Sequence, residues 1–348
     1  MLIERIEAKW VELFADVFRQ CAVQQGDTVA ILAETQSRPV LVELADLAAQ
    51  RLGARSFRLI VPTPALPGAI PIRSTGASSA LQRLGPAIDA LKGSTFVVDL
   101  TVEGLLHAEE LPAILGGGAR VLMVSNEHPE ILERTKPDPA LESRVRAGMR
   151  MLKSAGTMKV TSTAGTDLTV QLAGARVGGG WGFTAKPGTI THWPGGLCLA
   201  FPAAGAVNGT LVMQAGDVNL TFKQYVRDAI RLTIVDDFIT AIDGIGVDVD
   251  MMRGYLSAWN ETDAYAVSHV GWGMNPAARW DALAFYDKRD CNGTELRAFA
   301  GNFLYSTGAN EVAGRRTLGH FDLPLRRCTI ALDDRIVVNE GSLQGELV

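Results

Sequence analysis

The segment TVAILAET, residues 28–35, is a short apolar run that begins directly after Gly26 and Asp27. A run of this length bounded by a turn signal predicts a buried strand. Residues 4–24 precede it with apolar side chains at helical spacing, and a second helical stretch runs from Pro39 to Leu52, where Gly53 ends it. A buried strand between two amphipathic helices is typical of α/β proteins.

The same alternation continues through the next seventy residues. Strands are predicted at FRLIVP (57–62), TFVVDLTV (95–102) and ARVLMVS (119–125), and helices at LGPAIDALKG (84–93) and about 105–115. Alternating helices and strands favour a Rossmann-like parallel layer structure over residues 1–150. No GxGxxG motif follows the first strand, so the pattern does not indicate a dinucleotide.

The pattern of polar and apolar residues changes after a long predicted helix at 138–155. The segments MKVTSTAGTDLTVQLAG (158–174) and GTLVMQAGDVNLTF (209–222) alternate polar and apolar residues, and glycines are frequent. This pattern predicts an antiparallel α+β domain over residues 151–348. The stretches GGGWG (178–182) and KPGTITHWPGG (186–196) are predicted as loops because of their glycine and proline content.

Bulk composition excludes several classes of protein. The 348 residues are 47% hydrophobic and 20% charged with a net charge of −5, which is ordinary for a globular protein of about two domains. We expect no nucleic-acid or membrane partner, because neither clustered basic residues nor an apolar run of ~18 residues is present. Four scattered cysteines and a charged N-terminus without a secretory signal favour free thiols and a cytoplasmic location.

The segment LGHFDLPLRRC, residues 318–328, contains the most informative pair of polar residues. In a strand, His320 and Asp322 would project from the same face, where they could bind one ion through nitrogen and oxygen. A hydrogen-bonded structural pair explains the same spacing. A third candidate, His269, lies in YAVSHVGWGMNP (265–276), although a loop histidine bonded to backbone is the simpler interpretation. Together they would form a 2-His-1-carboxylate set, which suits non-haem Fe(II), and zinc also accepts three such ligands.

The neighbours of the three remaining histidines suggest a position or role for each. His107 follows a predicted strand, at the edge of an α/β sheet where ligands bind, and His192 lies beside Trp193, which could stack on a flat substrate. Either histidine could equally be a solvated loop residue. His128 precedes Pro129 in a polar turn and is expected on the surface.

Several motifs together resemble the 2,5-dihydroxypyridine 5,6-dioxygenase family, a distant relative of the aminopeptidase T-like metallopeptidases. They are SHVGWGMNP (268–276), GNFLYSTGANE (301–311), HFDLPLRRCTIALDD (320–334), LLH (105–107) and HWPGG (192–196). The resemblance implies an aminopeptidase T-like fold with a metal-binding C-terminal domain. It also implies Fe(II) bound by His269, His320 and Asp322.

The resemblance further implies the roles of other residues. His107 would be the acid/base group, and Leu106, His192 and Ser306 would contact a small aromatic substrate. Dioxygen would open a hydroxylated N-heteroaromatic ring and leave a product of the N-formylmaleamate type. We also expect a homo-oligomer.

The alternative function is a metallopeptidase or hydrolase of the aminopeptidase T type. Those relatives bind two metal ions, and two of their extra ligands correspond to Leu197 and Leu304 here. One mononuclear site therefore fits the sequence better. A binding protein without chemistry is disfavoured, because it would be expected to lack the three candidate ligands. The chain departs from the dioxygenase pattern at Gly180, where the family has a glutamate that contacts substrate, so the resemblance implies the reaction class but not one particular substrate.

Overall fold

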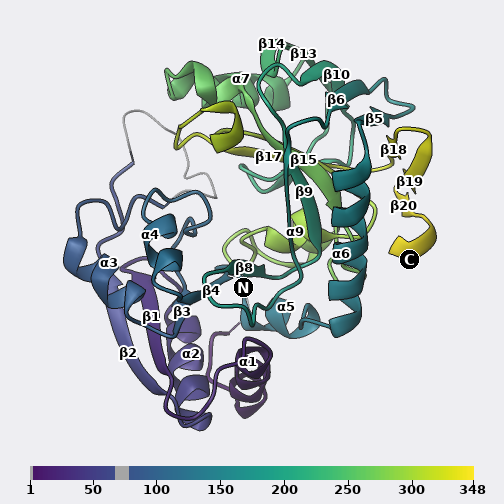
Figure 1. The fold of residues 1–348 in the computed structure, drawn as a ribbon. Coiled ribbons are helices and arrows are strands. Elements are labelled where there is room, and N and C mark those ends of the chain that lie inside the picture. The colour runs from purple at the N-terminus through teal and green to yellow at the C-terminus, as the bar shows by residue number, and fades with distance from the viewer. Residues whose placement is uncertain (1–2, 67–77) are drawn as a thin grey trace.

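The computed structural model describes residues 3–66 and 78–348. Its N-terminal part is built on a five-stranded sheet in which every neighbouring pair is parallel (Figure 1). The strands, in their order across the sheet, are β2 (Arg55–Val61), β1 (Thr28–Glu34), β3 (Phe96–Asp99), β4 (Arg120–Val124) and β8 (Ile190–Trp193). The parallel α/β layer predicted from the alternating pattern is confirmed.

Strand β1 lies between two hydrophobic cores and contributes side chains to both. Val29, Ile31 and Ala33 pack into the core formed with α1 and α2, whereas Ala30 and Leu32 face the core formed with α3 and α4. Successive side chains of a strand point to opposite faces, so one fully apolar run serves both layers. The helices of this part are α1 (Ala8–Gln20), α2 (Pro39–Arg51), α3 (Gly85–Lys92), α4 (Leu111–Gly116) and α5 (Pro129–Arg134).

Two antiparallel sheets form most of the C-terminal part, which confirms the antiparallel arrangement predicted from the sequence pattern. The smaller sheet has the order β17 (Phe321–Leu325), β16 (Phe303–Thr307), β15 (Val267–Gly273), β9 (Leu197–Phe201) and β7 (Arg176–Gly180). The larger sheet has the order β14 (Phe238–Asp243), β13 (Ile230–Val235), β10 (Val207–Met213), β6 (Asp167–Gln171), β5 (Thr157–Thr161), β18 (Thr329–Leu332), β19 (Arg335–Asn339) and β20 (Ser342–Leu343).

Shorter elements complete this part. They are α7 (Val247–Ala258), α8 (Ala282–Phe285), α9 (Thr294–Ala298), the pair β11 (Val218–Asn219) and β12 (Gln224–Tyr225), and the 3₁₀ turns Thr262–Tyr265, Glu311–Ala313 and Gly345–Leu347.

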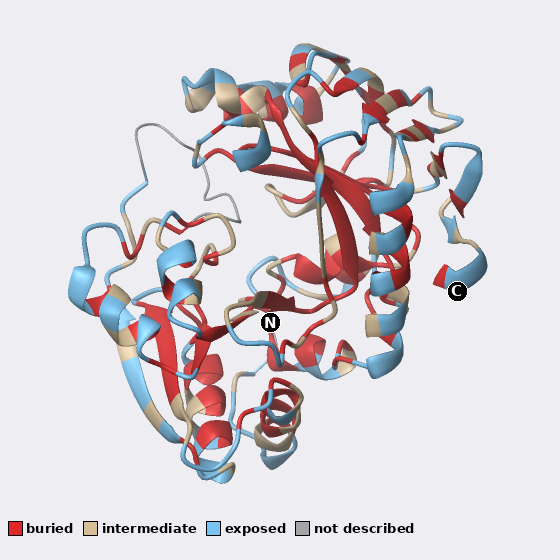
Figure 2. Cartoon of the chain, in the orientation of Figure 1, coloured by how far each residue is buried: buried red, intermediate tan, exposed pale blue. Residues whose placement is uncertain are grey.

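The long helix α6 (Pro139–Ser154) joins the two parts and packs on β7 and β9. The Asp138 side chain caps its first turn, at the position where the predicted helix over 138–155 begins. Gly148 lets the helix approach the sheet closely, because a Cβ there would stand 2.8 Å from Cys198 Sγ. Figure 2 shows the result, with one face of α6 exposed and the strands beneath it buried.

Several predictions of local structure were wrong. The glycine-rich stretch at 178–182 overlaps the edge strand β7, and the predicted loop at 186–196 contains β8, which pairs with β4 (Ile190–Trp193 beside 121–124). The chain therefore returns to the first sheet after residue 150, and the domain boundary at that residue remains a prediction. The helix expected at 105–115 begins only at Leu111, because residues 100–106 form a loop held by Asp99.

His128 is buried, although a surface position was predicted. Its side chain is only 2% exposed, its ring lies 5.6 Å from that of Trp10, and Nδ1 accepts the Glu130 N–H at the start of α5. The four cysteines are free, as expected, and all four are buried. Of the helices described, none combines the length and the apolar character that crossing a membrane demands.

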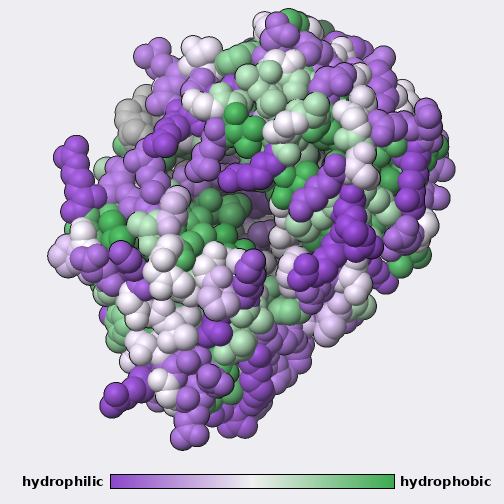
Figure 3. All heavy atoms as spheres, in the orientation of Figure 1, coloured by the Kyte–Doolittle hydropathy of each residue, from purple (hydrophilic) through white to green (hydrophobic). Residues whose placement is uncertain are grey.

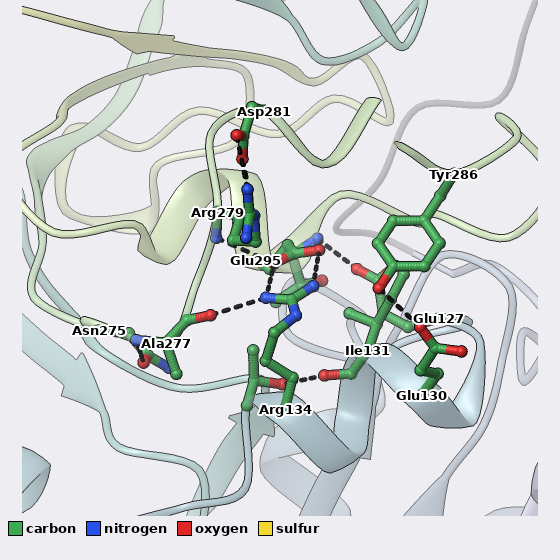
Figure 4. Close-up of polar contacts among 12 residues, drawn as sticks. Glu127, Glu130, Ile131, Arg134, Asn275, Ala277, Arg279, Asp281, Tyr286 and Glu295 are labelled. Carbon is green, nitrogen blue, oxygen red and sulfur yellow. Dashed lines mark hydrogen bonds and ion pairs between the residues drawn. The ribbon is translucent and has the colours of Figure 1, made fainter. Parts of the chain in front are cut away.

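A buried ionic network joins α5 to α9 (Figure 4). Glu295 on α9 is fully buried and accepts two hydrogen bonds from Arg134, at 2.8 and 3.0 Å. Glu127, also fully buried, accepts backbone N–H groups from Asn292 and Gly293 at 2.6 and 2.9 Å. Burial and the nearby Glu295 raise the pKa of Glu127. The network fixes α9 against the N-terminal part.

We predict that Arg134→Ala destabilises the protein by about 3–5 kcal/mol, because it leaves the Glu295 carboxylate buried without its cation. The matched control is Arg279→Ala, which breaks an exposed ion pair with Asp281 and should leave stability nearly unchanged. Thermal and denaturant unfolding measure both. Equal effects of the two substitutions would contradict this account.

Candidate metal centre and active site

Three neighbouring strands bring the candidate metal ligands together. In the antiparallel register, His269 on β15 pairs with Ser306 on β16, and Ser306 pairs with Asp322 on β17. His320 lies two residues before Asp322, just before β17, so both project toward the same side. Nitrogen and oxygen atoms of His269, His320 and Asp322 all lie within 4.8 Å of one another. Among residues 3–66 and 78–348, this is the group of histidines and carboxylates with spacing suitable for a metal ion.

Hydrogen bonds fix the orientation of these groups. The Ser268 hydroxyl donates to the carbonyl of Ala309 at 2.6 Å, so its oxygen accepts from Nδ1 of His269 at 3.1 Å. This assignment leaves Nε2 of His269 unprotonated, 3.8 Å from Oδ1 of Asp322. Such bonds behind a histidine set its tautomer and ring direction in metal sites.

The Asp322 carboxylate is 2% exposed and has partners on both oxygens. Ser306 donates its hydroxyl to Oδ1, and Nε of Arg297 donates to Oδ2 at 2.6 Å. Nε2 of His320 lies 3.1 Å from Oδ2. Burial by itself would raise the pKa of Asp322, but Arg297 and the two histidines hold that pKa well below its usual range. The side chain is therefore a carboxylate at neutral pH.

Burial acts on the histidines in the opposite direction. It lowers the pKa of His269 well below its ordinary value, against the attraction of Asp322. For His107, burial and the nearby His320 lower the pKa to about 3. A neutral His269 imidazole beside the ionised Asp322 carboxylate has the protonation state that a divalent metal ion requires of its ligands.

A pocket of about 60 Å³ opens beside these groups, which is room for several waters because one needs roughly 10–15 Å³. Leu106, His107 and His192, all expected at the site, line it together with His269, His320 and Asp322. The ring of His107 lies 5.6 Å from that of His320 and 6.1 Å from that of His269. Figure 3 shows the molecule hollowed on this face, with hydrophobic residues inside the hollow.

The loop that carries His107 is fixed by the buried Asp99 at the end of β3. One oxygen of Asp99 accepts the Thr101 N–H and hydroxyl, at 3.0 and 2.7 Å, and the other accepts the Leu105 N–H at 2.8 Å. Burial outweighs these hydrogen bonds and raises the pKa of Asp99 to about 6. These bonds hold the backbone just before His107 in place.

His192 is held by a single strong contact. Its Nδ1 lies 2.6 Å from the carbonyl oxygen of Pro194, which can only accept, so Nδ1 carries the proton. Burial lowers the pKa of the ring, and Nε2 is left as an acceptor. Gly180 lies alongside, because a Cβ built there would stand 3.0 Å from Nε2 of His192.

Two predicted substrate contacts take other positions. Trp193 is fully buried in the N-terminal core, where its ring lies 5.1 Å from that of Phe14 and its N–H donates to the Thr135 carbonyl. Neighbouring residues of a strand point to opposite faces, so His192 faces the pocket and Trp193 faces away from it. The predicted stacking role of Trp193 is therefore wrong. Ser306 is fully buried beneath Asp322, and its hydroxyl is directed to that carboxylate.

Comparison with known proteins identifies the family. The sequence profile described as NicX, 2,5-dihydroxypyridine 5,6-dioxygenase, matches residues 9–345. The chain belongs to the 2,5-dihydroxypyridine 5,6-dioxygenase family. A 2,5-dihydroxypyridine 5,6-dioxygenase from Pseudomonas putida KT2440 is 38% identical over 340 residues, which cover 97% of this chain and 96% of the relative.

Solved structures agree with this assignment. The structure of 2,5-dihydroxypyridine dioxygenase from Pseudomonas putida KT2440 is similar with a TM-score of 0.92 and 36% identity, over 99% of this chain and 100% of that chain. Wild-type AmpT from Thermus thermophilus is similar with a TM-score of 0.66 and 15% identity, over 97% and 99% of the two chains. The second likeness confirms the aminopeptidase T-like fold expected from the sequence.

Sequence reasoning missed Arg297, which lines the pocket of this dioxygenase family member and contacts Asp322. The available signal was an arginine in TELRAFAGN (294–302), where apolar neighbours predict burial and hence a carboxylate partner. Glu103, Asn292 and Thr294 also line the pocket and were not predicted. They lie on loops or at a helix start, where side-chain direction is not set by periodicity.

Leu197 and Leu304 line the same pocket. The sequence resemblance led us to expect that these positions correspond to metal ligands in the two-metal peptidases. Both side chains are almost fully buried, at 3% and 0% exposure, and they pack in one apolar cluster with Leu199. The pocket therefore offers apolar surface where a second ion would need donors.

We predict that Ser306→Ala weakens metal binding about 10–100-fold, because it removes a hydrogen bond that orients Asp322. The control is Ser257→Ala, an exposed serine of α7, which should leave metal binding unchanged. Titration of metal-free protein with Fe(II) under anaerobic conditions gives both dissociation constants. Unchanged affinity in Ser306→Ala would contradict a supporting role.

Proposed function

We propose that the chain is a mononuclear non-haem Fe(II) dioxygenase that cleaves the ring of 2,5-dihydroxypyridine or a related hydroxylated N-heteroaromatic. Both atoms of O₂ enter the product, which is of the N-formylmaleamate type. The observation that carries the proposal is the set of two buried imidazoles and one buried carboxylate beside a pocket, in a chain of this dioxygenase family.

The donor set fits iron. His269, His320 and Asp322 would hold the ion, and their chemistry matches the 2-His-1-carboxylate set of non-haem Fe(II) oxygenases. When bound, Fe(II) supplies the redox chemistry that allows O₂ to react with an electron-rich ring. Leu197 and Leu304 provide no donors for a second ion, which disfavours a dinuclear peptidase.

The remaining residues act on the substrate. His107 offers a neutral imidazole next to the candidate ligands, where it takes the proton of a substrate hydroxyl and returns it to the product. His192 accepts a hydrogen bond at Nε2 and so orients the ring. Leu106, Leu197 and Leu304 shield the reacting atoms from water. The cytoplasmic location and the homo-oligomer expected from the sequence remain predictions.

We predict that His320→Ala and Asp322→Ala abolish both iron retention and O₂ uptake, because each removes a donor from a three-residue site. Asp334→Ala, at an exposed position, is the control and should retain both. Metal analysis after anaerobic reconstitution, followed by oxygen-electrode assays with hydroxypyridines, measures the outcome. Full activity in either ligand variant would contradict the assignment, and two tightly bound ions with anaerobic aminopeptidase activity would favour the alternative.

His107→Ala should retain iron but turn over about 10²–10⁴-fold more slowly, because a positioned proton-transfer group contributes a factor of that size. Single-turnover rates of iron-loaded protein measure the effect. Loss of iron in this variant would contradict a role outside the metal ligands, and an unchanged rate would contradict the proton-transfer role.

A further inference from the structure

A second cavity adjoins the pocket at the metal centre, which we call the metal pocket. The second cavity measures about 270 Å³, whereas the metal pocket measures about 60 Å³. We call it the outer cavity, and the residues that line it include His107, Arg176, Phe201, Glu261, Arg316 and Leu318. Because His107 lines both cavities, they meet at this side chain. No step of the proposed chemistry uses the outer cavity.

Strand β9 runs from one cavity to the other. Its alternate residues Leu197, Leu199 and Phe201 share one face and pack in one apolar cluster, whereas Cys198 and Ala200 point into the opposite core. Leu197 and Leu199 line the metal pocket, and Phe201, two residues further along the same face, lines the outer cavity. The border between the cavities therefore crosses β9 next to Phe201.

Contacts on several sides fix the ring of Phe201 at this border. Arg176 of β7 is its direct partner in the antiparallel register, and the guanidinium carbon lies 4.6 Å from the centre of the phenyl ring. Toward the metal centre, the ring of His269 lies 5.3 Å from that of Phe201. The ring of His107 lies 6.2 Å from the phenyl ring and meets it edge-on. The rings of His107 and Phe201 thus close the metal pocket toward the outer cavity.

We propose that Phe201 limits the substrate to a single six-membered ring, because its side chain separates the metal pocket from the outer cavity. A fused second ring would need the space that the phenyl group fills, and well-packed sites accept extra atoms poorly. Loss of the phenyl group would join the two cavities and admit bicyclic hydroxylated N-heteroaromatics. This proposal rests on the proposed function for the ring class, but ligand binding tests it without turnover.

The test compares 2,5-dihydroxypyridine with 1,4-dihydroxyisoquinoline by calorimetric titration of Fe(II)-loaded protein in the absence of O₂. The second ligand carries a fused benzo ring on the edge of the pyridine ring that leaves the nitrogen, both hydroxyls and the bond between carbons 5 and 6 unchanged. The variants are Phe201→Ala, which removes the partition, and Phe201→Leu, which removes part of it.

Phe299→Ala is the matched control. Phe299 belongs to the same apolar cluster as Phe201 and is buried to a similar extent, at 6% against 8% exposure, but it lines neither cavity. A general loosening of the cluster would therefore affect both alanine variants. Melting temperatures and iron content verify that every variant is folded and loaded.

We expect the unchanged protein to bind the single-ring ligand about 10–100-fold more tightly than the bicyclic ligand, which is a typical penalty for extra atoms forced into a packed site. This ratio should fall close to one in Phe201→Ala, take an intermediate value in Phe201→Leu and stay unchanged in Phe299→Ala. A ratio unaffected by Phe201→Ala, an equal change in Phe299→Ala, or equal binding of the two ligands to the unchanged protein would overturn the proposal.

Oxygen uptake separates this proposal from the proposed function. If iron-loaded protein cleaves no hydroxypyridine while Phe201→Ala still gains affinity for the bicyclic ligand, the dioxygenase assignment fails and the size limit stands. If 2,5-dihydroxypyridine is cleaved but Phe201→Ala gains no affinity for the bicyclic ligand, the size limit fails and the dioxygenase assignment stands.

Discussion

The rest of the site depends on one buried negative charge, the carboxylate of Asp322. Burial of a lone carboxylate costs several kcal/mol, so the fold must supply partners to it. It does so from neighbouring elements, through Ser306 on the next strand, Arg297 on α9 and the imidazoles of His269 and His320. The same partners that keep Asp322 ionised also leave it ready to share its oxygens with a metal ion.

This arrangement requires accurate placement of α9, a helix of only five residues. Such a short helix is not stable by itself, and the network of Glu127, Arg134 and Glu295 ties it to the N-terminal part. Asp99 fixes the loop of His107 from the other side of the pocket. The N-terminal layers therefore contribute to the site twice, by supplying His107 and by holding the helix that carries Arg297.

Sequence patterns predicted the features that depend on local periodicity. The apolar run of β1 predicted a buried strand, and the two-residue spacing of His320 and Asp322 predicted side chains on one face. Positions set by distant partners were missed. His128 was placed on the surface because nothing local shows that Trp10 packs against it. Trp193 was misassigned because β8 was not expected to be a strand, and only strand geometry separates its direction from that of His192.

We propose that this pocket, with apolar Leu197 and Leu304 in place of further ligands, supports one iron ion and the insertion of both atoms of O₂ into a ring. The most direct test is mass spectrometry of the product formed from 2,5-dihydroxypyridine by iron-loaded protein under ¹⁸O₂. We predict two labelled oxygen atoms in a single ring-opened product. A product with one labelled atom or none would contradict it.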